Sequence, residues 1–299
     1  MKKALLLIIA ITIFVPGFSY VISVPVGPTS LPAYYLEDNS EIEVQTIIHK
    51  NRNVLISNLM QGKADMALMP TNEAAKLYNK GLDVKIINIH TWGVFYLVTT
   101  NPQIKEWEDI GGKEIYVPDK GGPMDILFNY ITNSKGIDNI KIKRGKPNQI
   151  TQMMINDLAE TAFLRETFVT QILVNNEKSR IFEDIQKNWR EITGIELPQA
   201  SFAVRGEILE KNPGFKDFLN LEYQKAIDWM YGNVEAAADL GEKKMKIPPK
   251  VTIKSIDRLN MKIADPLEIE KNINEYLDLL KKYNVESIGG KLPDENFFY

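Results

Sequence analysis

The stretch Leu59-Met-Gln-Gly-Lys-Ala-Asp-Met-Ala-Leu-Met-Pro-Thr-Asn72 predicts the fold of this chain, because it occurs a second time in related form. The second copy is Met154-Ile-Asn-Asp-Leu-Ala-Glu-Thr-Ala-Phe-Leu-Arg-Glu-Thr167. Each copy indicates the end of an amphipathic helix, a tight turn, a short apolar strand, a polar loop and a new helix. Such a unit places a helix N-terminus at the carboxyl end of a strand, where α/β sheets bind ligands. Two units therefore predict two similar lobes with a site between them.

The composition is that of an ordinary globular protein. The chain has 299 residues, of which 44% are hydrophobic and 25% are charged, which suits two α/β lobes. The formal net charge is -3, and lysine and arginine are scattered, so no nucleic-acid partner is expected. The absence of cysteine excludes disulfides, a thiolate nucleophile, a cysteine-based metal site and the lipid-attachment cysteine of many exported proteins.

The N-terminus departs from this ordinary composition. Lys2 and Lys3 precede the apolar run Ala4–Ile11, and a helix-breaking Pro-Gly pair with small residues follows. This pattern predicts a signal peptide over residues 1–19, cleaved after Ser19. The alternative, an uncleaved membrane anchor, needs a longer apolar run to span a bilayer. We expect a periplasmic protein that is exported, cleaved and not a lipoprotein.

Strand and helix patterns alternate along most of the chain. Strands are expected over 21–26, 43–48, 65–69, 84–89, 94–99, 114–117, 140–143, 160–164 and 201–204, with helices over 31–37, 52–61, 73–80, 124–132, 148–156 and 165–176. The last third reads as helical, with start signals at Asn212-Pro213 and Asp265-Pro266. The predicted fold class is α/β, with two similar lobes, each a mostly parallel sheet flanked by helices, joined by two hinge crossings.

The lobe boundaries follow from the places where the chain could cross. No low-complexity linker is present, so the crossings are expected to be short, near Thr99–Pro102 and Leu197–Phe202. Residues 20–100 and 201–299 would then form a discontinuous lobe 1, and residues 101–200 would form lobe 2. Two short crossings of this kind would act as a hinge.

The residues offer little for catalysis. The two histidines, His49 and His90, stand outside any histidine-rich or acidic metal-ligand pattern. The nucleophile elbow, the phosphate-binding loop and the zinc-protease motif are all missing. We therefore expect a protein that is not an enzyme and that has no catalytic residue, no metal and no cofactor.

Candidate ligand-binding residues in the first lobe lie where predicted strands end. Thr29 and Ser30 open the first helix of the mature chain, and Thr71 and Asn72 open a later one. Free backbone N–H groups and hydroxyls at such places suit an anionic or carbonyl group, although plain helix capping is the alternative. Trp92, near the predicted hinge, could stack on a flat ligand or could simply be a core residue.

Corresponding places in the second lobe carry glycine and charge. Gly121 and Gly122 let the backbone approach a ligand, and Pro123 suits a first helical position, which an ordinary strand-to-helix turn would also explain. Arg165 and Glu166 follow the strand of the second repeat. The arginine could bind a ligand carboxylate or sulfonate, or pair with Glu166 or another acidic residue across the cleft.

Taken together, these motifs resemble a known family. They are Gly27-Pro-Thr-Ser30, Gly62-Lys-Ala-Asp-Met-Ala-Leu68, Trp107-Glu-Asp-Ile-Gly-Gly-Lys-Glu-Ile-Tyr-Val117, Gly121-Gly122, Phe163-Leu-Arg-Glu-Thr-Phe168, Phe202-Ala-Val-Arg205 and Ile288-Gly-Gly-Lys-Leu-Pro-Asp-Glu-Asn-Phe-Phe-Tyr299. The chain resembles the periplasmic substrate-binding proteins of ABC importers, in the group that binds nitrate, sulfonates, taurine and thiamine precursors. The resemblance implies the type 2 periplasmic binding protein fold, a small-molecule ligand between two lobes, an ABC transporter permease in the inner membrane as partner, and a monomer.

Two features depart from the group and leave the ligand open. Members often have serine or threonine after the second-lobe glycine, where this chain has Pro123, and Glu-Pro where it has Arg165 and Glu166. The expected ligand is a small organic molecule, anionic or heterocyclic. Alternatives are an enzyme on the same fold acting on a small aromatic or pyrimidine-like substrate, and a ligand-sensing receptor subunit.

Overall fold

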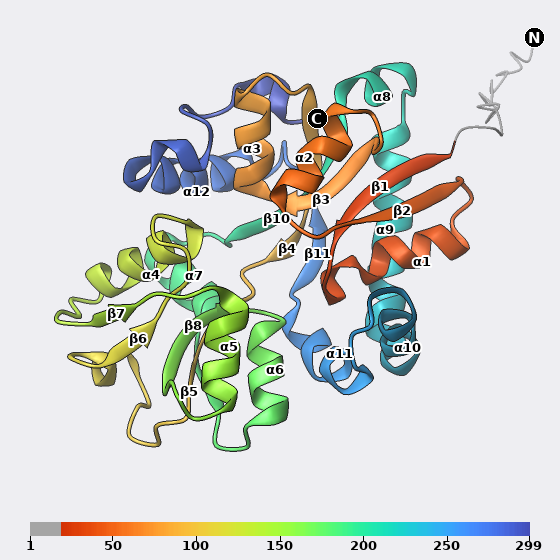
Figure 1. Cartoon of the computed structure of the whole chain (residues 1–299). Coiled ribbons are helices and arrows are strands. Elements are labelled where there is room, and N and C mark those ends of the chain that lie inside the picture. The colour runs from red at the N-terminus through yellow and green to blue at the C-terminus, as the bar shows by residue number, and fades with distance from the viewer. Residues whose placement is uncertain (1–18) are drawn as a thin grey trace, which may run out of the picture.

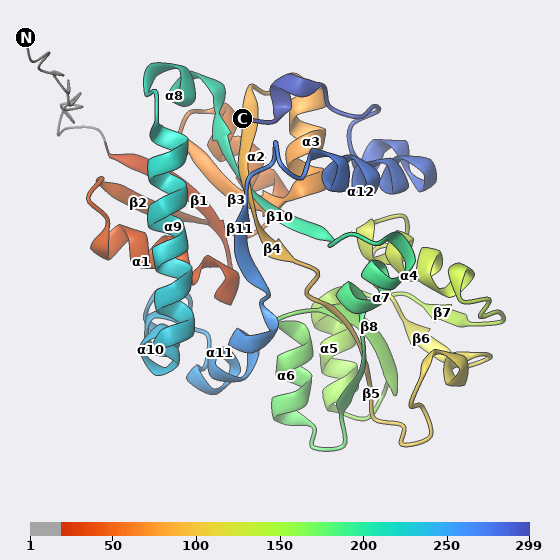
Figure 2. The same ribbon diagram turned by 180° about the vertical axis from the view of Figure 1, so that it is seen from behind.

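The computed structural model describes residues 19–299, and two halves face each other in it (Figure 1). The predicted signal peptide lies outside the described residues, apart from its last residue, Ser19. Each half is built on one sheet with helices on its faces, and Figure 2 shows the same division from behind. The α/β fold of two lobes is confirmed.

The first sheet has the strand order β11-β4-β10-β3-β1-β2. Its strands are β1 (Tyr20–Pro25), β2 (Val44–His49), β3 (Met66–Pro70), β4 (Val84–Trp92), β10 (Pro198–Arg205) and β11 (Met261–Ala264). The helices of this half are α1 (Leu31–Asn39), α2 (Arg52–Met60), α3 (Thr71–Asn79), α8 (Gly206–Lys211), α9 (Phe215–Gly232), α10 (Val234–Met245), α11 (Pro249–Ser255) and α12 (Glu270–Tyr283). Short 3-10 turns are η1 (Pro28–Ser30), η3 (Ile256–Arg258), η4 (Val285–Ser287) and η5 (Glu295–Phe297).

The second sheet has the order β7-β6-β8-β5-β9. It comprises β5 (Phe95–Thr99), β6 (Glu114–Tyr116), β7 (Lys141–Lys143), β8 (Thr161–Arg165) and β9 (Arg180–Asp184). Its helices are α4 (Pro123–Ser134), α5 (Pro147–Ile155), α6 (Phe168–Asn175) and α7 (Ile185–Thr193), and the turn η2 (Trp107–Ile110) precedes β6.

Both sheets are mixed in direction. In the first, β1 is parallel to β2 and β3, whereas β10 runs antiparallel to β3 and β4, and β11 runs antiparallel to β4. In the second, β6 is parallel to β7 and β8, whereas β5 runs antiparallel to β8 and β9. Every antiparallel pair of these sheets includes β4, β5 or β10, which are the strands next to the two crossings between the sheets.

The position of β5 differs from the expected division at residue 100. Phe95–Thr99 was expected in lobe 1, but it pairs with β8 and β9 of the second sheet. All five of its residues are buried, so its sequence carries no alternation that would identify a sheet. We propose that the first crossing lies between Trp92 and Phe95 and the second between Thr193 and Pro198.

The two crossings lie side by side. The amide of Gly93 donates to the carbonyl oxygen of Leu197 at 3.1 Å, so the outgoing and returning chains are joined directly. Gly93 has a φ of 72°, and a Cβ there would lie 2.6 Å from Cβ of Gln186. Only glycine therefore fits this turn, both for its backbone angle and for its close packing. Val94 follows with a φ of 64°, which is strained for a β-branched residue.

Buried apolar side chains connect the halves around these crossings. One core cluster includes Ile89 and Trp92 of β4 in the first sheet, and Phe95 and Phe163 in the second. Two further clusters fill the remaining faces, one under α1 and α9 and one under α5 and α6. Among residues 19–299, no helix combines the length and the apolar character needed to span a membrane.

Phe163 provides a test of the second half's core. It is fully buried, with its ring 5.7 Å from Phe128 and 6.0 Å from Phe95 between ring centroids. We expect Phe163→Ala to lower the free energy of unfolding by about 3–5 kcal/mol, through lost transfer energy and a residual cavity. Urea unfolding followed by circular dichroism measures this. The control Leu158→Ala, at a side chain that is 71% exposed, should change it by less than about 0.5 kcal/mol. Equal effects of the two substitutions would contradict this assignment of the core.

Candidate functional site

A cleft of about 420 Å³ lies between the two halves. Elements of the first half supply one wall, and the ends of strands and helices of the second half, with the loop residue Asp119, supply the other. Its lining residues are Arg52, Pro70, Asn72 and Glu73 from the first half, Phe95, Asp119, Pro123, Met124, Pro147 and Arg165 from the second, and Gln199 on β10. A cleft of this size is in the range that holds small organic ligands.

A narrow recess of about 70 Å³ adjoins the cleft. Pro70, Arg165 and Gln199 line both spaces, so the recess continues the cleft toward the crossing strands. Its other lining residues are Pro25, Thr29, Leu68, Met69, His90, Thr91, Val94, Glu166 and Ala200. Because the recess is small and largely apolar, it would admit only the tip of a ligand.

The predicted residues of the first half are divided between these walls and the core. Asn72 lines the cleft, and its Nδ2 donates to the carbonyl oxygen of Ser287 at 3.2 Å. Thr29 lines the recess. The buried hydroxyl of Ser30 donates to the carbonyl oxygen of Pro25 at 2.7 Å, so Ser30 holds the loop together. The hydroxyl of Thr71 is buried and has no hydrogen-bond partner within residues 19–299.

Trp92 lies outside the lining of both spaces. It is 3% exposed, and its indole N–H donates to the carbonyl oxygen of Lys262 at 2.9 Å. The ammonium group of Lys262 lies 5.2 Å from its ring centroid. Trp92 therefore packs at the hinge, as the core alternative predicts.

The glycine loop of the second half is held by bonds to its own helix. The amide of Gly121 donates to Oδ2 of Asp125 at 2.8 Å, and that carboxylate also pairs with Arg144 at 2.7 Å through Oδ1. Gly121 has a φ of 73°, which favours glycine. Of the three predicted loop residues Gly121, Gly122 and Pro123, only Pro123 lines the cleft.

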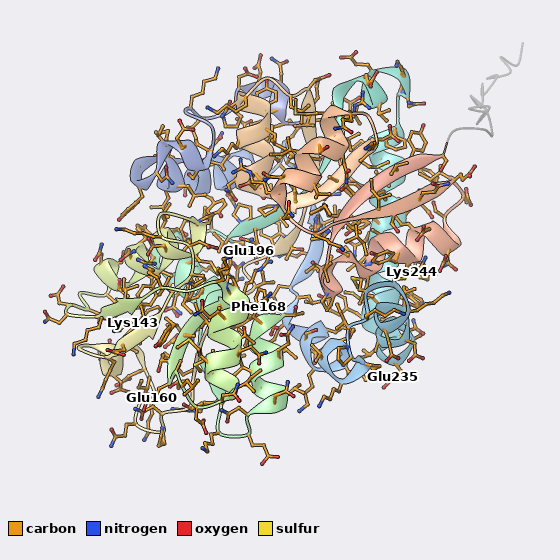
Figure 3. All side chains as sticks on the ribbon, in the orientation of Figure 1. Lys143, Glu160, Phe168, Glu196, Glu235 and Lys244 are labelled. Atoms are coloured by element: carbon orange, nitrogen blue, oxygen red, sulfur yellow. The ribbon has the colours of Figure 1, made fainter. Side chains whose placement is uncertain are left out.

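Arg165 is the predicted residue that reaches both spaces. Its side chain is exposed, and its guanidinium lies 5.6 Å from the ring centroid of Phe168. Figure 3 shows Phe168 near the centre of the molecule, at the start of α6. Surrounding protein desolvates the guanidinium and lowers the pKa of Arg165, while Asp119 acts in the opposite direction. Such a side chain sits in a concave place yet stays accessible to a ligand.

Glu166, beside it, is held in a different way. Its side chain is 1% exposed and pairs with Nε of Arg258 at 2.5 Å. Its other oxygen accepts from the hydroxyl of Thr170 at 2.8 Å. Glu166 borders the recess, but its carboxylate is bound by protein groups on both oxygens.

Several lining residues escaped the sequence analysis. Arg52 and Glu73 form an ion pair at 2.6 Å in the first wall, and Asp119 stands in the second. Burial raises the pKa of Glu73, and Arg52 opposes that shift. Gln199 lies on the returning strand β10. The cleft lining thus holds two cationic and two anionic side chains, and within residues 19–299 Arg165 makes no ion pair.

The histidines are buried and bonded to hydroxyl groups. His90, on β4 beside the recess, has Nδ1 2.9 Å from the hydroxyl oxygen of Thr91. Burial lowers the pKa of His90 to about 3, while the backbone of Ser201 acts in the other direction, and within residues 19–299 Nε2 of His90 has no hydrogen-bond partner. Nδ1 of His49 lies 3.0 Å from the hydroxyl oxygen of Ser23, and burial lowers the pKa of His49 to about 4. Both imidazoles are therefore neutral at pH 7.

Comparison with known families agrees with this arrangement. The sequence profile of a family described as NMT1/THI5 like matches residues 33–237, which is more than half of the chain. The chain belongs to the NMT1/THI5-like family. The predicted resemblance is confirmed. No curated protein matches the chain by sequence.

Solved structures share the fold of this NMT1/THI5-like chain. An ABC transporter protein of Parabacteroides distasonis is 22% identical, with a TM-score of 0.80, covering 94% of this chain and 98% of its own. The periplasmic aliphatic sulphonate binding protein of Escherichia coli is 14% identical, with a TM-score of 0.73, covering 89% of this chain and 93% of its own. The periplasmic nitrate-binding protein of Synechocystis is also 14% identical, with a TM-score of 0.58 and coverages of 80% and 69%. These identities establish the shared fold alone.

The buried histidines predict how stability depends on pH. Above pH 6.5 they are neutral in the folded and unfolded states; below it only the unfolded chain takes up protons, down to pH of about 3–4. The free energy of unfolding should therefore fall by about 2 kcal/mol per histidine at pH 5, relative to pH 7.5. Urea unfolding at the two pH values measures the loss. Nitrogen NMR of histidine-labelled protein supplies the control, and an imidazole of the folded protein that titrates near pH 6.5 would contradict the assignment.

Proposed function

We propose that the protein is the extracytoplasmic solute-binding component of an ABC importer. It captures a small organic ligand in the cleft between its lobes and delivers it to a permease in the inner membrane. The observation that carries this proposal is the cleft itself, lined from both halves, with Arg165 free to bind a ligand. The structural neighbours from E. coli and Synechocystis, which are periplasmic binding proteins for aliphatic sulphonate and nitrate, support it.

Closure of the lobes follows from the position of the lining residues. A ligand that touches Asn72 on one wall and Arg165 on the other gains both contacts only when the halves are close. Binding then shifts the population toward the closed form, whereas a ligand held by one wall would shift nothing. The permease would recognise that closed form.

The charges of the cleft favour one anionic group on the ligand. Arg52 is already neutralised by Glu73, so Arg165 is the cation available to it. The nearby Asp119 limits the total positive charge and would disfavour a multiply charged anion. A singly charged anion, or a heterocycle that presents an acceptor to Arg165, suits this balance.

The chemistry of the site supports binding rather than catalysis. A general base needs a poised pKa and an oriented partner, but His90 is neutral, buried and bonded to Thr91. Glu166 has both carboxylate oxygens occupied by protein donors. We also propose that residues 1–19 are a cleaved signal peptide and that the mature protein is a periplasmic monomer without a lipid anchor.

A small panel of compounds tests the proposal. Ethanesulfonate and nitrate represent the anions named for the structural neighbours, and cytosine represents a heterocycle. We expect one of them to bind in isothermal titration calorimetry and to reduce the radius of gyration in X-ray scattering. Tight binding without compaction would reject the closing clamp, and turnover of a bound compound would favour the enzyme alternative.

Arg165→Ala tests the charged wall. A hydrogen bond to a charged group contributes about 1.5–3 kcal/mol, so the affinity for the bound anion should fall about 10- to 100-fold. Lys271→Ala is the matched control, because it removes one positive charge at a side chain that is 83% exposed on α12. If both variants bind as the original protein does, Arg165 is not part of the binding site.

A further inference from the structure

The glycine loop of the second half is bonded to the C-terminal part of the chain. Nδ2 of Asn284, directly after α12, donates to the carbonyl oxygen of Gly121 at 2.8 Å. Oδ1 of the same side chain accepts from the amide of Glu286 at 3.2 Å. Asn284 is thereby fixed in orientation, and the loop that it holds carries Asp119 and Pro123 into the cleft.

The segment that begins with Asn284 is attached to the other wall as well. We call residues 284–291 the strap. The carbonyl oxygen of Ser287 accepts from Nδ2 of the cleft residue Asn72, and Nδ2 of Asn79 donates to the carbonyl oxygen of Ile288 at 2.7 Å. A Cβ on Gly289 would lie 2.9 Å from the carbonyl oxygen of Lys76, so the strap lies tightly against α3. One short segment therefore bonds to α3 in the first half and to the glycine loop in the second.

The second cleft loop has an equivalent attachment on the opposite flank. Arg258 pairs with Glu166, and its Nη2 donates to the hydroxyl of Thr170 at 2.5 Å. The carbonyl oxygen of Arg258 accepts from the hydroxyl of Tyr96 at 3.1 Å. Glu166 directly follows Arg165 in the chain, so this pair fixes the backbone from which the cleft arginine projects. Figures 1 and 2 both show α11, which precedes Arg258, beside α6.

We propose that Asn284 and Arg258 are positioning residues for ligand binding. Each belongs to the C-terminal part of the first half and is bonded to one loop of the second half that borders the cleft or its recess. When the lobes separate, both contacts break and the two loops lose their supports. Closure therefore brings the walls together and also sets the geometry of Asp119, Pro123 and Arg165. This inference rests on the proposed function, because it assigns the closed lobes as the binding state.

The test uses ligand-free protein, so that it does not depend on the identity of the solute. The chain has no cysteine, so Met60→Cys on α2 and Leu158→Cys after α5 give two unique positions for a fluorescent donor and acceptor. Hydrogen exchange at the amides of Gly121 and Thr170 reports on the two loops.

Asn284→Ala should speed exchange at Gly121 about two- to tenfold, the factor expected for the loss of one hydrogen bond, and should lower energy transfer between the lobes. Arg258→Ala should speed exchange at Thr170 by a similar factor and should also lower energy transfer between the lobes. The matched controls are Asn175→Ala, whose amide bonds only within α6, and Lys178→Ala, which breaks an ion pair inside the second half. Neither control should change energy transfer or exchange at Gly121.

Removal of Arg258 alone leaves a buried carboxylate without its partner and could prevent folding. The double variant Glu166→Gln/Arg258→Gln is therefore measured beside it, and Arg258→Lys should restore part of the protection. The proposal is overturned if both attachments can be removed without a change in energy transfer, or if exchange rises equally throughout the second half. In that case the panel of compounds can still show that the protein binds a solute. Conversely, if no compound of the panel binds, the exchange and energy-transfer results remain valid, so the two proposals are tested separately.

Discussion

The paired crossings at Gly93 and Leu197 are the constraint on which the rest of the structure depends. One hydrogen bond joins the outgoing chain to the returning chain, and glycine at position 93 allows them to lie this close. Both sheets are therefore connected through these two adjacent crossing segments, and the ends of their strands face each other across the cleft. The cleft is a direct consequence, because residues as distant in sequence as Arg52 and Gln199 meet beside these crossings.

The two walls of the cleft have different supports. On the first wall, Arg52 and Glu73 neutralise each other, and Asn72 is bonded to the strap. On the second wall, the neighbouring Glu166 forms an ion pair with Arg258, whereas Arg165 makes no ion pair within residues 19–299. Under the proposed function, these adjacent residues would have two tasks, Arg165 to present a charge to the ligand and Glu166 to hold the backbone. A charge that is kept in place by its neighbour costs less conformational entropy when a ligand arrives.

Much of the architecture could be predicted from the sequence, and the failures have physical causes. Strand and helix alternation predicted the elements as far as α6 to within a few residues, because glycine, proline and polar turn residues separate successive apolar runs. The strand β9 was missed because all its residues are half-buried and no alternation exists to detect. The helix α7 was missed although the signal was present, with Asp184 as N-cap and Ile185 and Trp189 four residues apart on one buried face.

The starts of the last helices and the residues of the cleft could likewise be predicted only in part from the sequence. The Asn-Pro and Asp-Pro pairs indicated helices near the right places, but α9 begins at Phe215 and α12 at Glu270, because tight turns intervene. For the site, strand ends pointed to Asn72, Pro123 and Arg165, which line the cleft, while their part in ligand binding stays a prediction. They could not reveal Arg52, which belongs to a helix, or Gln199, which belongs to a returning strand, since neither position has a local motif.

The outer strand of the second sheet has a consequence for how copies of this protein meet. At β7, Lys141 and Lys143 are exposed on either side of the half-buried Ile142, and within residues 19–299 Lys143 pairs with Glu114 at 3.3 Å whereas Lys141 makes no ion pair. A sheet edge with free backbone groups is a template for strand addition from another chain. Here an incoming strand would have to displace water from two ammonium groups, so charge protects this sheet edge from aggregation.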